Sequence, residues 1–393
     1  MKSLYPVLKL GELVKAKGGK RLPSGKTYSQ HKTDHAYLRV CDFRKGTIND
    51  DDLRYIDNDI HNKISRYTID EKDVFLSIAG TIGIAGVVPK RLSGSNLTEN
   101  AAKLVIKDKS KLNKNYLAWF LNTCGQVEIA NQTKATSQPK LALFRIEELT
   151  IPLPPLQEQI RIAAILDKAD TIRSKRQQAI KLADDFLRAT FLDMFGDPVT
   201  NHKDWEIKAF SEIGELNRGK SKHRPRNAPE LLGGPYPLIQ TGDVANSNGY
   251  IKEYKSTYSE LGLKQSKIWT SGTLCITIAA NIAKTGILTF EACFPDSVVG
   301  FTPNNLTTTE YVQAWLGFLQ KTLEAKAPES AQKNINLEIL RNLEIPIPPL
   351  SQQNNFSLIV NQVNNVLTKI NTNIECSDKL FNALSQKAFK GEI

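Results

Sequence analysis

Two short stretches of the sequence gather positive charge and contain no acidic residue. Residues 15–26 read KAKGGKRLPSGK, and residues 217–226 read NRGKSKHRPR. Glycine and proline predict loops there, and exposed lysine and arginine side chains on loops can contact phosphate oxygens or the guanine edge in the major groove. A run of charge is usually only a solvated surface, but its recurrence favours nucleic-acid contact. We predict DNA contacts for Lys15, Lys17, Lys20, Arg21, Lys26, Arg218, Lys220, Lys222, Arg224 and Arg226.

A second pair of polar stretches lies further along, at residues 133–140 and 326–334. Amide side chains with a lysine nearby can read base edges, and glutamine and asparagine are suited to adenine. Polar loops of this kind are also ordinary connectors, and the sequence leaves that alternative open. The candidate contacts are Lys134, Gln138, Lys140, Gln332, Lys333 and Asn334.

No motif in the sequence supplies a complete catalytic centre. It has no GxxxxGK[ST] phosphate loop, no glycine-rich dinucleotide turn, no HExxH, and none of the Asn-Pro-Pro-Tyr type of tetrapeptide that amino-methylating enzymes use. Asp296 with Glu324 and Lys326 matches the loose spacing of metal-dependent nucleases, although the first half has no equivalent. The five cysteines are scattered and lack CxxC spacing, so we predict neither a disulfide framework nor a metal site.

Composition limits the class of protein. The 393 residues allow two or three cores, and the formal net charge of +11 points to a polyanionic partner. No stretch approaches the about 18 consecutive apolar residues of a membrane span, and the first residues have no secretory pattern. We therefore expect a cytoplasmic protein without a membrane partner.

One long helix is predicted between Ile151 and Pro198. Pro152, Pro154 and Pro155 allow a helix to begin only at about Pro155, and Gly196 followed by Pro198 ends it. About forty residues at about 1.5 Å each make a rod of roughly 60 Å. Its predicted apolar stripe needs a partner helix and consists of Ile162, Ile165, Ala169, Ile172, Ala179, Ala183 and Phe186.

The sequence contains this helix twice. At an offset of 194, IPLPPL at residues 151–156 becomes IPIPPL at residues 345–350, and Gln159 becomes Gln353. At an offset near 200, Gly19-Lys20 becomes Gly219-Lys220. Strand-like runs at residues 73–89 and 272–290, and short helices around Trp119 and Trp315, predict mixed α/β segments. We infer an internal repeat with domains at residues 1–150 and 199–344 and long helices at residues 151–198 and 345–393.

These motifs resemble the specificity (S) subunit of type I restriction-modification systems, over essentially the whole chain. The resemblance rests on IPLPPLQEQ with its helix ending in FLDMFGDP, and on IPIPPLSQQ with its helix ending in FKGEI. It implies an α+β fold in which two target recognition domains each read half of a split, asymmetric sequence in double-stranded DNA. It also implies that the two helices pair as an antiparallel coiled-coil spacer with pseudo-twofold symmetry.

The resemblance further implies a chain without catalytic residues that docks two methyltransferase (M) subunits and, through them, restriction (R) subunits. S-adenosylmethionine would bind the M partner, and ATP and Mg the R partner, with no cofactor in this chain. The candidate docking residues are Gln157, Glu158, Gln159, Arg161, Lys168, Gln352 and Gln353, although Ser351 and Gln352 depart from the first copy. A scaffold protein whose helices form a coiled-coil dimer is the rival interpretation.

Overall fold

The computed structural model describes residues 3–133, 139–223, 225–279, 282–326, 335–371 and 374–393. The chain forms two compact units, of which unit 1 comprises residues 1–177 and 371–393 and unit 2 comprises residues 178–370. Each unit joins one globular domain to part of both long helices. The boundaries predicted from the sequence separate each domain from the helix that follows it, whereas the two units divide the long helices between them.

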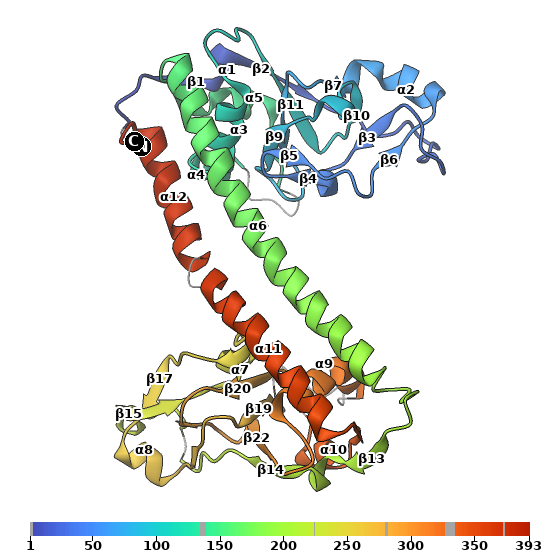
Figure 1. Cartoon of the computed structure of the whole chain (residues 1–393). Helices are drawn as coiled ribbons and strands as arrows, with labels where there is room; N and C mark the ends of the chain where they lie inside the picture. Colours follow the sequence, from blue (N-terminus) through green and yellow to red (C-terminus); the bar gives the residue numbers. More distant parts are fainter. Residues whose placement is uncertain (1–2, 134–138, 224, 280–281, 327–334, 372–373) are drawn as a thin grey trace. The chain divides into compact units, whose positions relative to one another are not determined.

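Among the described residues, unit 1 contains two four-stranded sheets and two two-stranded pairs, one of which is β4 (Phe43–Arg44) with β5 (Thr47–Ile48) (Figure 1). The four-stranded sheet with the longer strands is called the larger sheet and is antiparallel throughout. Its strand order is β2 (Val14–Gly18), β11 (Ala101–Ile106), β8 (Val74–Ser77), β9 (Ala85–Val87). The smaller sheet has the order β6 (Arg54–Tyr55), β3 (Ala36–Leu38), β10 (Ser95–Leu97), β7 (Thr68–Ile69). Strand β1 (Val7–Lys9) pairs with β12 (Thr150–Pro152).

Strand β8 is buried throughout because its two faces meet different cores. Val74 and Leu76 belong to the main core of unit 1, whereas Phe75 between them packs in a second core with Phe43. Alternate side chains of a strand point to opposite faces, so a run of four buried residues marks a strand covered on both sides. The main core is completed by helices α1 (Leu10–Leu13), α3 (Lys114–Asn122), α4 (Gln126–Gln132) and α5 (Leu143–Glu148).

Unit 2 repeats this arrangement with one added strand in its larger sheet and, in the part of the chain that the structure describes, without a counterpart of the β4–β5 pair. Its larger sheet has the order β14 (Gly214–Arg218), β22 (Val298–Pro303), β19 (Leu274–Thr277), β20 (Thr285–Leu288), β16 (Gly249–Ile251). Strand β19 corresponds to β8, since Leu274 and Ile276 face the main core and Cys275 faces another. The smaller sheet has the order β17 (Ser256–Tyr258), β15 (Leu232–Leu238), β21 (Ala292–Cys293), β18 (Ile268–Trp269).

The remaining elements of unit 2 also have counterparts in unit 1. Strand β13 (Glu206–Ala209) pairs with β23 (Glu344–Ile347) as β1 pairs with β12. Helix α9 (Thr309–Lys326) buries Trp315 as α3 buries Trp119, so both tryptophans are core residues as predicted. Helices α7 (Thr241–Ala245), α8 (Glu260–Lys264) and α10 (Leu337–Arg341) complete the unit.

The predicted long helix is α6 (Leu156–Phe195), an unbroken helix of 40 residues that is followed by Gly196 at a φ of 80°. The second copy comprises α11 (Leu350–Asn371) and α12 (Ile374–Lys390). No helix among the described residues is long and apolar enough to cross a membrane.

Within each unit, α6 runs antiparallel to its partner helix. In unit 1, Arg161 Nη2 donates to the Ile393 carbonyl at 2.7 Å, and the Arg173 guanidinium lies 4.9 Å from the centre of the Phe381 ring. In unit 2, the rings of Phe191 and Phe195 lie 5.7 and 5.5 Å from that of Phe356 on α11. The sequence prediction of tandem mixed domains with paired antiparallel helices is confirmed.

The predicted apolar stripe of α6 is wrong in its middle. Ile172 is 45% exposed and Phe186 is 52% exposed, whereas Ala163, Leu166 and Phe191 are buried. A single stripe assumed one partner along the whole helix. The first turns of α6 instead pack into the core of unit 1 and the last turns into the core of unit 2, so the buried positions change along its length.

Candidate nucleic-acid interface

The chain leaves the sheet after β2 at Gly19-Lys20, a segment that we call the Gly-Lys turn, and the Lys20 side chain is exposed to solvent. The Gly19 amide donates to the Ala101 carbonyl at 3.0 Å, and the Lys20 amide donates to the Leu97 carbonyl at 2.8 Å. A Cβ atom on Gly19 would lie 2.1 Å from the Thr98 carbonyl oxygen, so only glycine fits. The backbone therefore fixes where the Lys20 side chain leaves the sheet.

Unit 2 contains the same turn after β14. The Gly219 amide donates to the Val298 carbonyl at 2.9 Å, and the Lys220 amide donates to the Phe294 carbonyl at 3.1 Å. A Cβ atom on Gly219 would lie 2.3 Å from the Phe294 carbonyl oxygen. The repeat of Gly-Lys that the sequence predicted is thus also a repeat of backbone geometry.

The second predicted polar stretch reaches the same end of the sheet in unit 1. The Leu141 amide donates to the Ile78 carbonyl at 2.9 Å, and the Ile78 amide donates to the Asn100 carbonyl at 2.8 Å. Lys140 is exposed and forms an isolated bridge with Ala79. We call this surface edge 1 and define it by residues 19–21, 79, 97–101 and 140.

The corresponding surface of unit 2 is edge 2, defined by residues 219–220, 226, 278, 294–298 and 335. The Ile335 amide donates to the Ile278 carbonyl at 2.9 Å, and the Ile278 amide donates to the Ser297 carbonyl at 3.1 Å. Two loops that are more than a hundred residues apart therefore meet at each edge. Among the candidate contacts, Lys134, Gln138, Arg224, Gln332, Lys333 and Asn334 lie outside the described residues.

Three of the predicted loop cations lie on strands instead. Lys15 and Lys17 belong to β2, and Arg218 is the last residue of β14. The prediction of a loop was wrong there because β2 alternates, with Val14 and Ala16 buried and the lysines exposed. Lys15 Nζ lies 3.2 Å from Glu147 Oε1. The Ala16 amide donates a hydrogen bond to the same oxygen, and this hydrogen bond lowers the pKa of Glu147.

Both edges also carry an arginine paired with a carboxylate. Arg21 Nε lies 3.4 Å from Glu99 Oε1, and Arg226 Nη2 lies 2.5 Å from Asp296 Oδ1. The sequence reasoning did not single out Glu99 and considered Asp296 only as a nuclease ligand. Glu99 lies 78 residues from Arg21 and Asp296 lies 70 residues from Arg226, so no local signal marks the pairs.

Nothing in the described residues supports a metal centre. Among them, no group of three or more histidine, cysteine, aspartate or glutamate side chains is arranged to hold a metal ion. Asp296 is paired with Arg226, and the side chains of Glu324 and Lys326 lie outside the description.

A cavity of about 260 Å³ opens beside edge 2. Its polar lining includes amides and a cation that can reach a base edge, with the Tyr258 ring as part of its wall. The sequence reasoning missed Asn227 and Gln240, because they become neighbours only when β15 and the loop after Lys220 come together. The lining residues are Ser221, Arg226, Asn227, Leu232, Leu238, Gln240, Thr241, Tyr258, Pro295 and Ser297.

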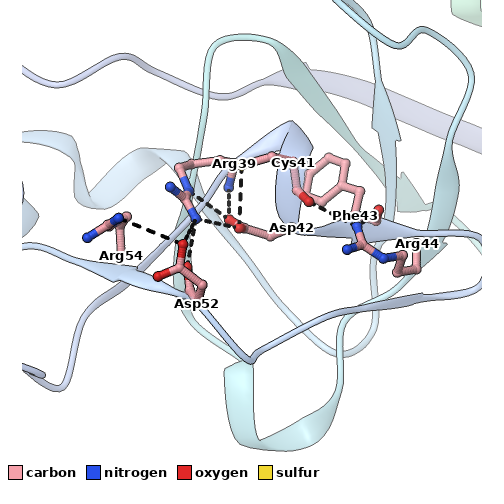
Figure 2. A network of polar contacts seen from close by, with 7 residues as sticks. All are labelled: Arg39, Cys41, Asp42, Phe43, Arg44, Asp52 and Arg54. Carbon is pink, nitrogen blue, oxygen red and sulfur yellow. Dashed lines mark hydrogen bonds and ion pairs between the residues drawn. The ribbon is translucent and has the colours of Figure 1, made fainter. Parts of the chain in front are cut away.

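A polar network stabilises the segment between the two smaller-sheet strands β3 and β6 (Figure 2). Arg39 Nη2 donates to Asp42 Oδ1 and to the Asp52 carbonyl, both at 2.7 Å, and Arg54 Nη2 lies 3.7 Å from Asp52 Oδ2. Arg44 Nη1 donates to the carbonyls of Cys41 and Phe43 at 2.9 and 2.8 Å. These contacts supplement the backbone hydrogen bonds of the short helix η1 (Val40–Asp42) and of the β4–β5 pair in the same segment.

Two residues predicted to dock partner subunits have a different role. Gln159 is fully buried, with Oε1 accepting from the Asn113 amide at 2.8 Å and Nε2 donating to the carbonyls of Lys111 and Pro154 at 2.8 and 2.9 Å. Tyr116 of α3 donates to the Pro152 carbonyl at 2.7 Å, and burial raises the pKa of this phenol. Gln159 thus joins the start of α6 to the start of α3.

Gln353 makes the corresponding contacts in unit 2 and also accepts from a side-chain hydroxyl. It is fully buried, accepts from the Thr307 hydroxyl and the Thr308 amide at 2.8 and 3.0 Å, and donates to the Pro348 carbonyl at 2.8 Å. The docking prediction is wrong for both glutamines, because their polar atoms are used inside the chain. Hydrogen-bonded polar groups of this kind fix the packing of one element on another.

The other predicted docking residues lie nearer the surface. Gln157, Arg161 and Lys168 are exposed on α6, and Gln352 is half-buried on α11. Glu158 Oε1 lies 2.6 Å from Arg161 Nη2, and this hydrogen bond lowers the pKa of Glu158. Their role stays a prediction.

Known proteins resemble the chain along almost its whole length. The family described as type I restriction modification DNA specificity domain matches residues 3–182 and 202–376. The type I restriction enzyme EcoBI specificity subunit of Escherichia coli is 22% identical over 339 residues, which cover 76% of this chain and 69% of that protein.

Two solved structures share the fold. The S subunit of a type I restriction-modification system from M. genitalium has a TM-score of 0.66 at 14% identity, covering 98% of this chain and 96% of that one. A chain from work on complex assembly of the type I R-M system has a TM-score of 0.50 at 17% identity, covering 99% and 98%. With two specificity domains in tandem, the chain belongs to the family of type I restriction-modification specificity subunits, which are non-catalytic DNA-recognition components.

Proposed function

We propose that the chain reads a split, asymmetric sequence in double-stranded DNA, with edge 1 contacting one half and edge 2 the other. The observation that carries this proposal is the recurrence of the Gly-Lys turn in both units, with the same backbone hydrogen bonds. A rigid backbone that presents a lysine can position a phosphate and set the register of the groove contacts nearby. Two such surfaces in one chain suit a target with two halves.

Base reading on edge 2 is assigned to the neighbouring cavity. Asn227 and Gln240 line it, and amide side chains can form bidentate hydrogen bonds with adenine. The phosphate contacts are assigned to Lys20 and Lys220, which are exposed. This division of roles follows the general rule that phosphate contacts position a protein and base contacts specify the sequence.

The paired helices are proposed to set the distance between the half-sites. Helix α6 is continuous and contributes to both units, and a helix resists bending where a flexible linker does not. Lengthening it should alter the accepted spacer and leave the bases unchanged.

Catalysis is proposed to come from partners in the cytoplasm. Two M subunits would bring S-adenosylmethionine and methylate adenine, and R subunits would bring ATP and Mg. Gln157, Glu158, Arg161, Lys168 and Gln352 are the proposed docking residues on the helices.

Mapping methylated adenines in DNA from cells with and without the chain tests the proposal. We expect one bipartite motif to lose methylation when the chain is removed. Two results together would instead support the scaffold interpretation. Methylation would be unchanged when the chain is removed, and the purified chain would retain bipartite and scrambled duplexes equally.

A further inference from the structure

Each edge carries one carboxylate at the same place in the segment whose carbonyls accept hydrogen bonds from the Gly-Lys turn. The Gly-Lys turn of edge 1 bonds to the carbonyls of Leu97 and Ala101, and that of edge 2 bonds to those of Phe294 and Val298. Glu99 is the middle residue of 97–101, and Asp296 is the middle residue of 294–298. The two acids are thus equivalent in backbone position although the sequences around them differ.

Each of these carboxylates holds an arginine of its own edge. The Arg21 side chain is 76% exposed and that of Glu99 is 27% exposed, while Arg226 and Asp296 are 45% and 36% exposed. Ion pairs at such exposure contribute little to folding stability, so stability alone does not account for a pair at both edges.

A carboxylate beside a phosphate-binding lysine has a clear electrostatic effect. It repels the DNA backbone, and it competes with phosphate for the arginine that it holds. A matched base pair can compensate for this cost, because a carboxylate accepts a hydrogen bond from the cytosine N4 amine, and a released arginine can bond to guanine. Non-target DNA offers only phosphates, so it cannot compensate for this cost.

We propose that Glu99 and Asp296 are specificity-determining residues that hold Arg21 and Arg226 away from the phosphates of non-target DNA. This inference rests on the proposed function of the two edges. It adds that discrimination depends on a repulsive group at each half-site as well as on attractive contacts.

The test compares the full-length chain with its Glu99→Gln and Asp296→Asn variants, using a fluorescein-labelled duplex of scrambled sequence. Each substitution keeps the shape of the side chain and removes one charge. We expect each variant to bind this non-target duplex roughly 3- to 10-fold more tightly, because the released arginine can then pair with a phosphate. The plot of log affinity against log salt should steepen by about 0.9 for each arginine released to a phosphate.

Asp50→Asn is the matched control. Asp50 is 37% exposed and pairs with Arg91 at 2.6 Å, as in the pairs above. Arg91 follows β9 at the end away from edge 1, because Val87 pairs with Val74 while Ala85 pairs with Leu76. Affinity for the scrambled duplex should therefore stay unchanged, and an equal gain in this variant would reduce the effect to net charge and overturn the proposal.

A second background separates arginine release from simple repulsion. In Arg21→Ala, the Glu99→Gln substitution should give little further gain, since no arginine remains to be released. A full gain there, or no gain in the Glu99→Gln and Asp296→Asn variants, would overturn the assigned role. A wild-type chain that shows no salt-dependent binding to any duplex would contradict the proposed function itself.

Discussion

Lys20 and Lys220 are the residues for which the two edges make the most direct prediction. Each follows a glycine that cannot carry a side chain, so the position of the lysine is fixed by the sheet. The Lys20→Ala and Lys220→Ala variants should each weaken binding to all duplexes alike. The slope of log affinity against log salt should become shallower by about 0.9 for each phosphate that the variant no longer neutralises.

Lys90→Ala provides the control for these lysine variants. Lys90 is exposed and begins the short helix η3 (Lys90–Leu92), beyond the end of β9 that lies away from edge 1. Its removal should leave the salt slope unchanged. If Lys90→Ala and Lys20→Ala gave equal slopes, edge 1 would not be the DNA-binding surface.

For single residues, the sequence could predict some of the side chains that lie at the two edges but not which groups those side chains contact. The Gly-Lys repeat was found because its residues are adjacent, and its geometry is confirmed. Glu99 and Arg21 are separated by 78 positions, and only the fold brings them together. Gln159 was misassigned for the same reason, since the amides and carbonyls that surround it come from a loop some fifty residues earlier.

Each of the two buried glutamines connects the start of a long helix to the globular domain before it, and substitution can test this connection. Gln159→Leu would leave the buried Pro154 carbonyl without this partner and would remove the partly buried hydrogen bonds to the Lys111 carbonyl and the Asn113 amide. We expect a loss of about 2–5 kcal/mol in the free energy of unfolding, because each orphaned buried group costs about 1–3 kcal/mol and such costs do not add fully. Denaturant titration measures it.

Gln157→Leu is the matched substitution two residues away. Gln157 is exposed on the same helix, so its replacement should change the free energy of unfolding by less than about 0.5 kcal/mol. Equal losses in the two variants would show that the hydrogen bonds of Gln159 are not what stabilises this connection. Gln353→Leu should behave as Gln159→Leu does, since its contacts correspond to those of Gln159.

The ends of the long helix were predictable because their signals are local. Proline before Leu156 and glycine after Phe195 set the bounds of α6 without reference to the rest of the chain. Its buried face was not predictable as a single stripe, because α6 changes partner between unit 1 and unit 2.

At the scale of the whole molecule, the duplication is the main fact. The two domains share a strand pairing, the Gly-Lys turn and a buried glutamine, as expected for an internal repeat. Shared architecture with different loop sequences is what a protein needs to read two unlike half-sites. Under the proposed function, the bases that are read would depend on side chains of the loops and on cavities such as that beside Tyr258.

The most direct test of the whole account is an insertion of four residues after Ala179, near the middle of α6. Adenine methylation is then mapped in cells that carry the lengthened chain. The account predicts a bipartite motif with the same bases in both halves and a changed number of base pairs between them. An unchanged spacer with altered half-site bases would contradict the claim that the domains read the sequence and the helices set the distance.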